Sequence, residues 1–157
     1  MAKNVEVTTP RTRLSAAVLG APDPRALAAF YEQLLGWTIT VSEGPRPGRP
    51  AEDGWAMLKP PDGGTGLSFQ YEPDYQRPVW PTTSEAQQMM IHLDIAVDDL
   101  DAASARAVDL GAAPADHQPQ ANVRVMLDPA GHPFCLFEGR SDVTKTDVIG
   151  VGDGNSC

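Results

Sequence analysis

Hydrophobic and polar positions follow the same order twice along this chain. In the first half, apolar residues recur at helical spacing between Asp23-Pro24, which is typical of a helix start, and Gly36, which is typical of a helix end. Short apolar stretches bounded by Pro and Gly flank this helix, as strands do. The predicted elements are a strand at 14–19, the helix, and strands at 37–41, 55–59 and 67–71.

The second half repeats this order with a weaker helix. An apolar run from Met89 to Val97 precedes Asp98-Asp99, and apolar residues then recur at helical spacing up to Gly111. Shorter strands are expected around 115–120, 123–127 and 133–138. The predicted organisation is a flexible segment at 1–12, a first βαβββ module at 13–71, a linker at 72–87, a second module at 88–139 and a flexible tail at 140–157.

Each module would have one sheet face covered by its helix and one face uncovered. Bringing the two uncovered faces together buries both, so we expect an α+β fold in which two tandem modules form an incomplete barrel around a cavity. A doubly wound parallel fold is disfavoured, because three strands follow each helix and no GxGxxG or GxxxxGK[ST] phosphate loop is present.

Charge and composition exclude several classes of function. The net charge of −9 repels nucleic acid, although it tolerates a cationic ligand and also serves solubility. No apolar run is long enough to cross a membrane or to act as a signal peptide, and the two cysteines do not form a disulfide framework. We expect a cytoplasmic protein that binds neither nucleic acid nor membrane.

Three segments carry a resemblance to a known superfamily. They are DPRALAAFYEQLLG at 23–36, HLDIAVDDLDAA at 92–103 and DPAGHPF at 128–134. Together they resemble the glyoxalase/bleomycin-resistance/dioxygenase superfamily, also called the vicinal oxygen chelate fold, over roughly residues 13–139. The resemblance implies the two-module fold and pairing into a homodimer, but it leaves the activity open, because the superfamily includes lyases, isomerases, dioxygenases, thiol transferases and binding proteins.

Metal-dependent members of this superfamily hold the ion on the first and last strands of each module. The resemblance places these positions at Ala16, near Ser68, at His92 and at Cys135, and only His92 is a ligand type that the relatives use. Because a hard divalent cation needs several oxygen or nitrogen donors, we expect no metal and no other cofactor. Zinc bound by His92 and Cys135 with Asp94 or Gln70 nearby, or ligands from a second chain, stay open as alternatives.

Strand alternation selects the side chains that would face the cavity. Tyr75 and Trp80 in the proline-rich linker could close its mouth or plug the join between the modules. The complete set of candidate ligand-binding residues is Trp55, Met57, Ser68, Gln70, Tyr75, Trp80, His92, Asp94, Arg124, Met126, Cys135 and Phe137.

His92 is the candidate catalytic residue, with Asp94 on the same face to orient its ring or raise its pKa. The alternative reading is a core histidine bonded to backbone. Cys135 is expected to fill space in the core rather than to react, and His117 and His132 are expected to be structural or solvated.

The leading functional hypothesis is a metal-independent protein of the resistance type, which sequesters an aromatic or cationic small molecule. The alternative is a lyase, isomerase or cyclase that uses His92 as an acid or base or as a metal ligand. A third hypothesis is a structural or regulatory protein with a vestigial cavity.

Overall fold

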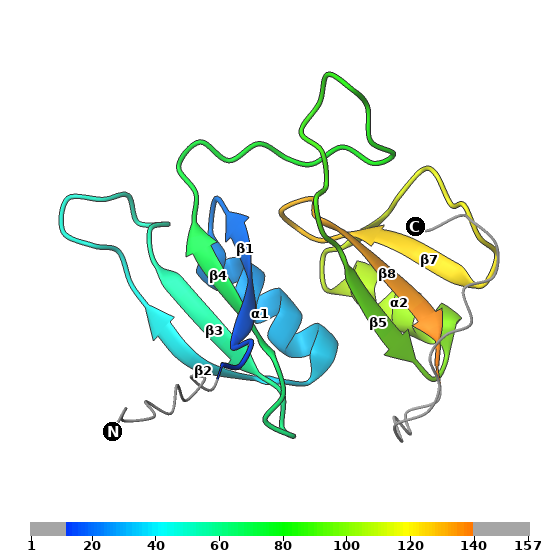
Figure 1. The fold of residues 1–157 in the computed structure, drawn as a ribbon, viewed down its shortest axis with the longest axis horizontal. Coiled ribbons are helices and arrows are strands. Elements are labelled where there is room, and N and C mark those ends of the chain that lie inside the picture. The colour runs from blue at the N-terminus through cyan, green and yellow to red at the C-terminus, as the bar shows by residue number, and fades with distance from the viewer. Residues whose placement is uncertain (1–11, 140–157) are drawn as a thin grey trace, which may run out of the picture.

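The computed structural model describes residues 12–139, as two α/β modules joined by a long connector (Figure 1). The first module contains β1 (Ala16–Ala21), α1 (Pro24–Leu35), β2 (Thr38–Glu43), β3 (Trp55–Lys59) and β4 (Gly66–Tyr71). The second contains β5 (Leu93–Val97), α2 (Leu100–Asp109), β6 (Ala113–Pro114), β7 (Val123–Leu127) and β8 (Pro133–Glu138). The predicted fold of two tandem βαβββ modules is confirmed. Of the segments expected to be flexible, 1–12 and 140–157, all residues but 12 lie outside the described part of the chain.

Both helices begin and end where the sequence pattern places them. The Asp23 carboxylate accepts the N–H of Ala26 at 3.0 Å, and the Asp99 carboxylate accepts that of Ala102 at 2.9 Å. These bonds satisfy backbone donors that have no partner within the helix. At the end of α1, Gly36 adopts the left-handed conformation with a φ of 65°, which glycine accepts without strain.

The two sheets have the same topology. Their strand orders are β1-β4-β3-β2 and β5-β8-β7-β6, and in each sheet the first and last strands of the module pair in parallel while the hairpin strands pair antiparallel. The first strand of each module therefore lies at a sheet edge. Both of these edges, β1 and β5, border the junction between the modules (Figure 1).

Helix α1 is shared between the modules. Tyr31 stacks on Phe69 of its own sheet at a ring-centroid distance of 5.6 Å and meets Phe134 of the second sheet edge-on at 6.3 Å. Phe30 also packs against Phe134, at 6.2 Å. Because these rings are buried, one continuous core holds the two modules together.

Two strands of the second module differ from the prediction. β5 begins at Leu93 rather than at Met89, because its partner strand β8 begins at Pro133, which has no N–H to donate. The strand expected at 115–120 does not form, and the two-residue β6 lies just before that range. Within the range, the side chain of Gln118 bonds to Ala115 O and to both the N and the O of Val125, and thereby takes the place of a backbone ladder.

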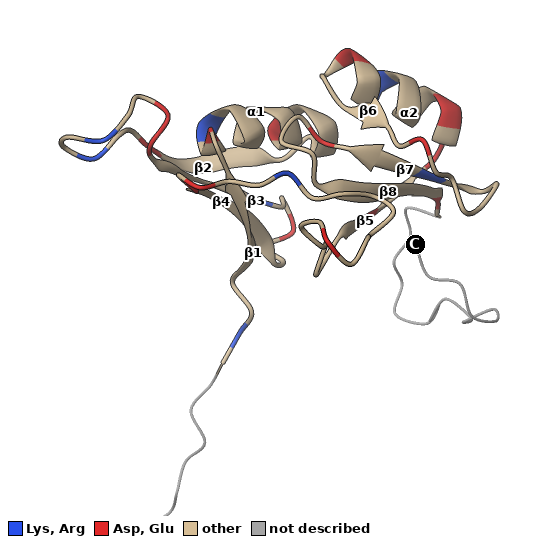
Figure 2. Cartoon of the chain, turned by 90° about the horizontal axis from the view of Figure 1, so that it is seen from above, with Lys and Arg blue, Asp and Glu red and all other residues tan. Residues whose placement is uncertain are grey.

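Both helices lie on the same side of the two sheets, and the opposite faces carry no helix and are open in part (Figure 2). On the second sheet, Trp80 of the connector packs against the buried Val125 and Cys135 of this open face. Val18 on the open side of the first sheet is 55 % exposed, and the side chain of Asp94 on that of the second is 59 % exposed. The two open faces therefore lie side by side and do not pack against each other as expected. None of the helices within residues 12–139 is long and apolar enough to cross a membrane.

Candidate functional site

A cavity of about 580 Å³ lies at the junction between the modules. Its walls come from β1, from Tyr31 of α1, from the connector at 72–78, from the segment 87–93 that leads into β5, and from His132 and Pro133. The edges of β1 and β5 leave this space because the modules are joined through α1 rather than by strand pairing.

The cavity walls are apolar with an acidic rim. Val18, Met90 and Ile91 line the cavity and are 55 %, 88 % and 77 % exposed, so the cavity is open to solvent on this side. Glu72 and Asp74 supply the charges, and no Lys or Arg of the described chain lines the space. Such a wall suits a neutral or cationic ligand with a large apolar body and disfavours an anion.

A buried carboxylate organises one wall of the cavity. Asp128 is 1 % exposed, and its Oδ1 accepts the N–H groups of Gly131 at 2.7 Å and of His132 at 2.9 Å. Its Oδ2 accepts the hydroxyl of Tyr31 at 3.0 Å and lies 2.9 Å from Nδ1 of His132. Because a carboxylate can only accept, the imidazole hydrogen is on Nδ1. Asp128 thus fixes the orientation of two cavity-lining side chains from different modules.

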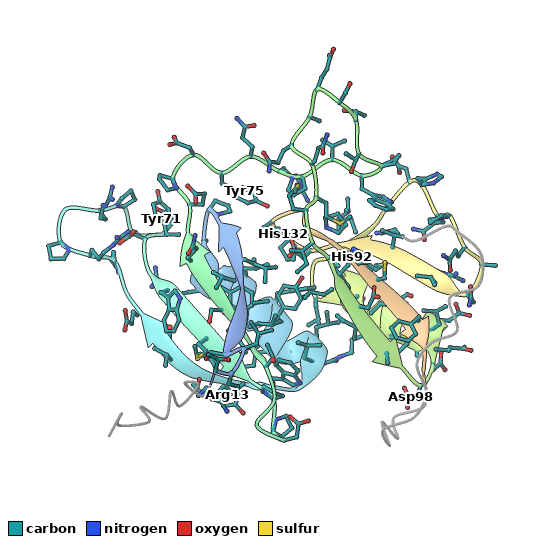
Figure 3. All side chains as sticks on the ribbon, viewed as in Figure 1. Arg13, Tyr71, Tyr75, His92, Asp98 and His132 are labelled. Carbon is teal, nitrogen blue, oxygen red and sulfur yellow. The ribbon has the colours of Figure 1, made fainter. Side chains whose placement is uncertain are left out.

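Tyr75 reaches the same wall from the connector (Figure 3). Its hydroxyl donates to Ala130 O at 2.9 Å and lies 3.2 Å from Nε2 of His132. The two rings are tilted, with centroids 5.6 Å apart. The side chain of His132 is 18 % exposed, and both it and Tyr75 line the cavity.

Burial keeps both tyrosines of this network protonated. Loss of solvation, followed by the Coulombic effect of Asp128, raises the pKa of Tyr31 well above its ordinary value. Loss of solvation and then Asp128 also raise the pKa of Tyr75 to about 12, against a smaller lowering by Arg77. At neutral pH both side chains are therefore hydrogen-bond donors rather than phenolates.

A second cluster of polar groups lies on the open face of the second sheet. The possible ligand atoms of His92, Asp94 and Cys135 all lie within 4.8 Å of one another, and His92 Nε2 is 3.1 Å from Asp94 Oδ1. The register pairs Asp94 with Cys135, so these two side chains share a face. Three donors of this kind fit zinc, but the thiolate and the small number of oxygens do not suit manganese or magnesium.

The first module offers no counterpart to this cluster. Ala16 stands where the second module has His92, and Ser68 stands where it has Cys135. Ala16 has no donor side chain, and Ser68 is a neutral hydroxyl that is 2 % exposed. The described chain therefore does not assemble a ligand set from both modules.

The other predicted site residues lie at several places. Trp55 and Gln70 face each other across β3 and β4 and line a smaller cavity of about 360 Å³ with Arg46. Met57 pairs with Ser68 on the same open face. Trp80 packs over the second sheet against the buried cluster of Ala115, Val125 and Cys135. Of all the candidates, only Tyr75 and His92 line the large cavity, and Cys135 and Phe137 lie on the open face of the second sheet.

The prediction that Arg124 and Met126 face inward is wrong. Met126 pairs with Phe134 and is 1 % exposed in the core beneath the helices, and Arg124 lies near Asp101 of α2, with 3.7 Å between charged groups. The residues of β7 that share the face of Cys135 are Val123, Val125 and Leu127. The predicted alternation of inward and outward side chains on β7 is wrong by one residue, because apolar residues occupy both faces of this strand.

The sequence reasoning also missed Tyr31, Asp128 and His132. Tyr31 fits the apolar face of α1 and Asp128 fits an ordinary hairpin turn, so neither is among the predicted site residues, and His132 was expected to be structural or solvated. A hydroxyl on the apolar face of a helix was the available signal, because a buried tyrosine needs an acceptor for its O–H.

Comparison with known proteins identifies the family. The model of the glyoxalase-like domain family matches residues 16–137. This chain belongs to that family. Its fold is similar to a glyoxalase/bleomycin resistance protein/dioxygenase family enzyme from Burkholderia phytofirmans, with 19 % identity, a TM-score of 0.56 and coverage of 81 % of this chain and 98 % of the other.

Two further similar proteins have different functions. A fosfomycin resistance protein from Listeria monocytogenes, described in complex with Mn(II), has 17 % identity and a TM-score of 0.60 over 83 % of this chain and 94 % of that chain. The anthracycline biosynthesis protein DnrV of Streptomyces peucetius is 32 % identical over 85 % of this chain. The chain spans about half the length of DnrV, with 49 % of it covered. The structural neighbours, at such low identity, show the fold alone.

Proposed function

We propose that this glyoxalase-like chain binds and sequesters an aromatic or cationic small molecule, without a metal, in the cavity between its modules. The observation that carries the proposal is the wall of that cavity: Val18, Met90 and Ile91 present apolar surface, and Glu72 and Asp74 supply the charge. A volume of about 580 Å³ is in the range of sites for drug-sized ligands. An apolar ring system would be buried there, and a positive charge would be attracted to the rim.

The similarity to DnrV supports an aromatic ligand. That protein is described as acting in anthracycline biosynthesis, and anthracyclines are polycyclic aromatic compounds. The acidic rim argues against a phosphonate ligand of the fosfomycin type, because Glu72 and Asp74 would repel it and no lining Lys or Arg of the described chain would offset them. Independence from metal is supported by the missing donors at Ala16 and Ser68.

A thermal-shift screen tests this proposal, since a ligand that binds only the folded chain raises the melting temperature. We expect stabilisation by aromatic amines or glycopeptide antibiotics in the presence of a chelator, and none by aromatic sulfonates of similar size. Val18→Arg should weaken the effect of an aromatic amine about tenfold or more, because it places a cation in the cavity wall. Val79→Arg is the matched control, since Val79 is 39 % exposed and does not line the cavity. Equal effects of the two variants would contradict the proposal.

The second candidate function is catalysis by His92 as a lyase, isomerase or cyclase. It is favoured by one observation, the contact of 3.1 Å between His92 Nε2 and Asp94 Oδ1 beside the cavity. A carboxylate at this distance can hold an imidazole as a general base, or both can bind zinc together with Cys135. Turnover that His92→Ala leaves unchanged, once a substrate is known, would exclude this mechanism.

We also propose that the chain forms a homodimer. The edges of β1 and β5 and the exposed Met90 and Ile91 are surfaces that a second copy would cover. Light scattering at several protein concentrations tests this, with a constant monomer mass as the contradicting result.

A further inference from the structure

The imidazole of His132 lines the cavity, with one nitrogen beside Asp128 and the other beside the hydroxyl of Tyr75. Figure 3 shows His132 and Tyr75 near each other. Nδ1 donates to the buried Asp128 carboxylate at 2.9 Å. Asp128 also holds the hydroxyl of Tyr31 and two backbone N–H groups, so its position is fixed from four sides. In a neutral imidazole with its hydrogen on Nδ1, the remaining nitrogen, Nε2, is a hydrogen-bond acceptor.

The donor that faces this acceptor is already shared. The hydroxyl of Tyr75 has one hydrogen and lies near two acceptors, Ala130 O at 2.9 Å and His132 Nε2 at 3.2 Å. A carbonyl oxygen is always an acceptor, and the shorter contact assigns the hydrogen to Ala130. Among the contacts made within residues 12–139, this wall therefore has one acceptor more than it has donors. An acceptor without a donor in a largely buried site costs free energy.

We infer that the ligand of this cavity carries a phenolic hydroxyl, which donates its hydrogen bond to Nε2 of His132. This inference rests on the proposed function, and it names the chemical class of the ligand. The apolar walls accept an aromatic ring, and the surplus acceptor selects an O–H group on it. Tyr75 is itself a phenol beside this imidazole, with ring centroids 5.6 Å apart, so the geometry of such a pair fits the site.

Binding of a phenol would complete the network without breaking it. Tyr75 keeps its bond to Ala130 O while the ligand's hydroxyl serves Nε2, and both acceptors are then satisfied. The start of the connector that carries Tyr75 is tied to β1 by the bond from Glu72 N to Ala21 O, and the bond from Val79 N to Gln87 O closes a loop within the connector, each at 3.0 Å. Arg77 packs over Gly131, where any side chain would collide with it, and this contact holds the middle of the connector.

The test compares phenols with their methyl ethers, which keep the ring and remove the donor. We would titrate β-naphthol and hydroxyphenanthrene, each with its methyl ether, into the chelator-treated full chain at about pH 8, where both phenols carry their hydroxyl hydrogen. The expected result is binding of each phenol about five- to tenfold more tightly than its ether, which is the usual net effect of one hydrogen bond. Tyr75→Phe should keep or increase this ratio, because it removes the competing hydroxyl.

His132→Phe should bring the ratio to about one, and His117→Phe should leave it unchanged, since His117 is exposed and does not line the cavity. Because His132→Phe also removes a partner of Asp128, a second readout uses the unmodified protein. Imidazole nitrogen NMR should show the Nε2 resonance of His132 shifting with each phenol and not with its ether.

The outcomes separate this inference from the function on which it rests. If phenols and ethers bind equally, or if the Nε2 resonance does not respond to a bound phenol, the inference is overturned while aromatic binding stands. If neither member of either pair binds, both the inference and the proposed aromatic ligand are overturned.

Discussion

The two modules carry the same hairpin turn in very different surroundings. In the turn before β4, the Asp62 carboxylate accepts the N–H of Gly64 at 3.0 Å on the exposed surface. In the turn before β8, Asp128 also accepts the N–H of a following glycine, Gly131, but it is buried and also binds Tyr31 from the other module. The difference shows that an ordinary turn becomes part of a site where the packing of the two modules buries it. Substitutions in the two turns therefore distinguish an effect on the turn alone from an effect on the cavity wall.

The largest expected effect is that of Asp128→Asn. The amide can accept at one position only, so it leaves donors of Tyr31 and His132 without a partner in a buried site. We expect a loss of about 2–4 kcal/mol in the free energy of unfolding, measured by urea denaturation. Asp62→Asn is the matched control and should stay within about 0.5 kcal/mol. Similar losses in the two variants would show that the module junction adds nothing to the turn.

A smaller effect is expected from Tyr31→Phe. The variant keeps the ring stacked on Phe69 and removes one donor from Asp128, which should cost about 1–2 kcal/mol in the free energy of unfolding. Tyr71→Phe, at the half-exposed end of β4, is the control. In a double-mutant cycle with Asp128→Asn, the losses should not add, because both variants break the same bond. Additive losses would place Tyr31 and Asp128 in separate interactions.

At alkaline pH, a change in stability is expected from Tyr75, which joins the connector to the second module. Its folded pKa of about 12 lies above the ordinary value near 10, so the folded chain holds this proton more tightly than the unfolded chain does. The resulting stability is fully present below about pH 10 and is lost as the pH rises toward 12. Absorbance titration of tyrosine should lose one group with a midpoint of about 12 in Tyr75→Phe. If Tyr75→Phe instead lost a tyrosine that titrates near pH 10, the partial burial of the Tyr75 hydroxyl would be contradicted.

The smallest expected effect is a loss of stability at acid pH, and it arises in the first module. Asp53 accepts the backbone N–H of Arg46 at 2.8 Å and its Nε at 2.9 Å, and these contacts lower the pKa of Asp53 to about 2. The stability that this pair supplies is present above about pH 4 and is lost as the pH falls toward 2. The difference in melting temperature between the parent chain and Asp53→Asn should therefore shrink across that range. A difference that does not change with pH would exclude the charged pair as its cause.

The fold could be predicted because it depends on local signals. Asp23, Gly36 and Asp99 act through bonds within a few residues, and alternation placed Ser68, Gln70, Asp94 and Cys135 on the correct faces. The phase of β7 could not be determined, because Val125 and Met126 are both buried and alternation then gives no direction.

The cavity could not be predicted for a different reason. Its walls come from pieces that lie far apart in the sequence, such as Val18, Tyr75 and His132, and only the packing of α1 against both sheets brings them together. The expectation that the open faces would enclose the ligand assumed that the modules meet face to face. In the structure they meet through Tyr31 and Phe134, so the enclosed space lies at the strand edges instead.

Calorimetric titration of an aromatic amine tests the central claim most directly, with the same protein measured after chelator treatment and after equilibration with zinc, manganese, nickel and iron. If binding in the cavity is independent of metal, we expect one ligand per chain with the same dissociation constant in every preparation, and a loss of affinity in Val18→Arg. Binding that appears only with a metal, together with near-stoichiometric metal that His92→Ala removes, would contradict it. That result would assign the function to the cluster of His92, Asp94 and Cys135 instead.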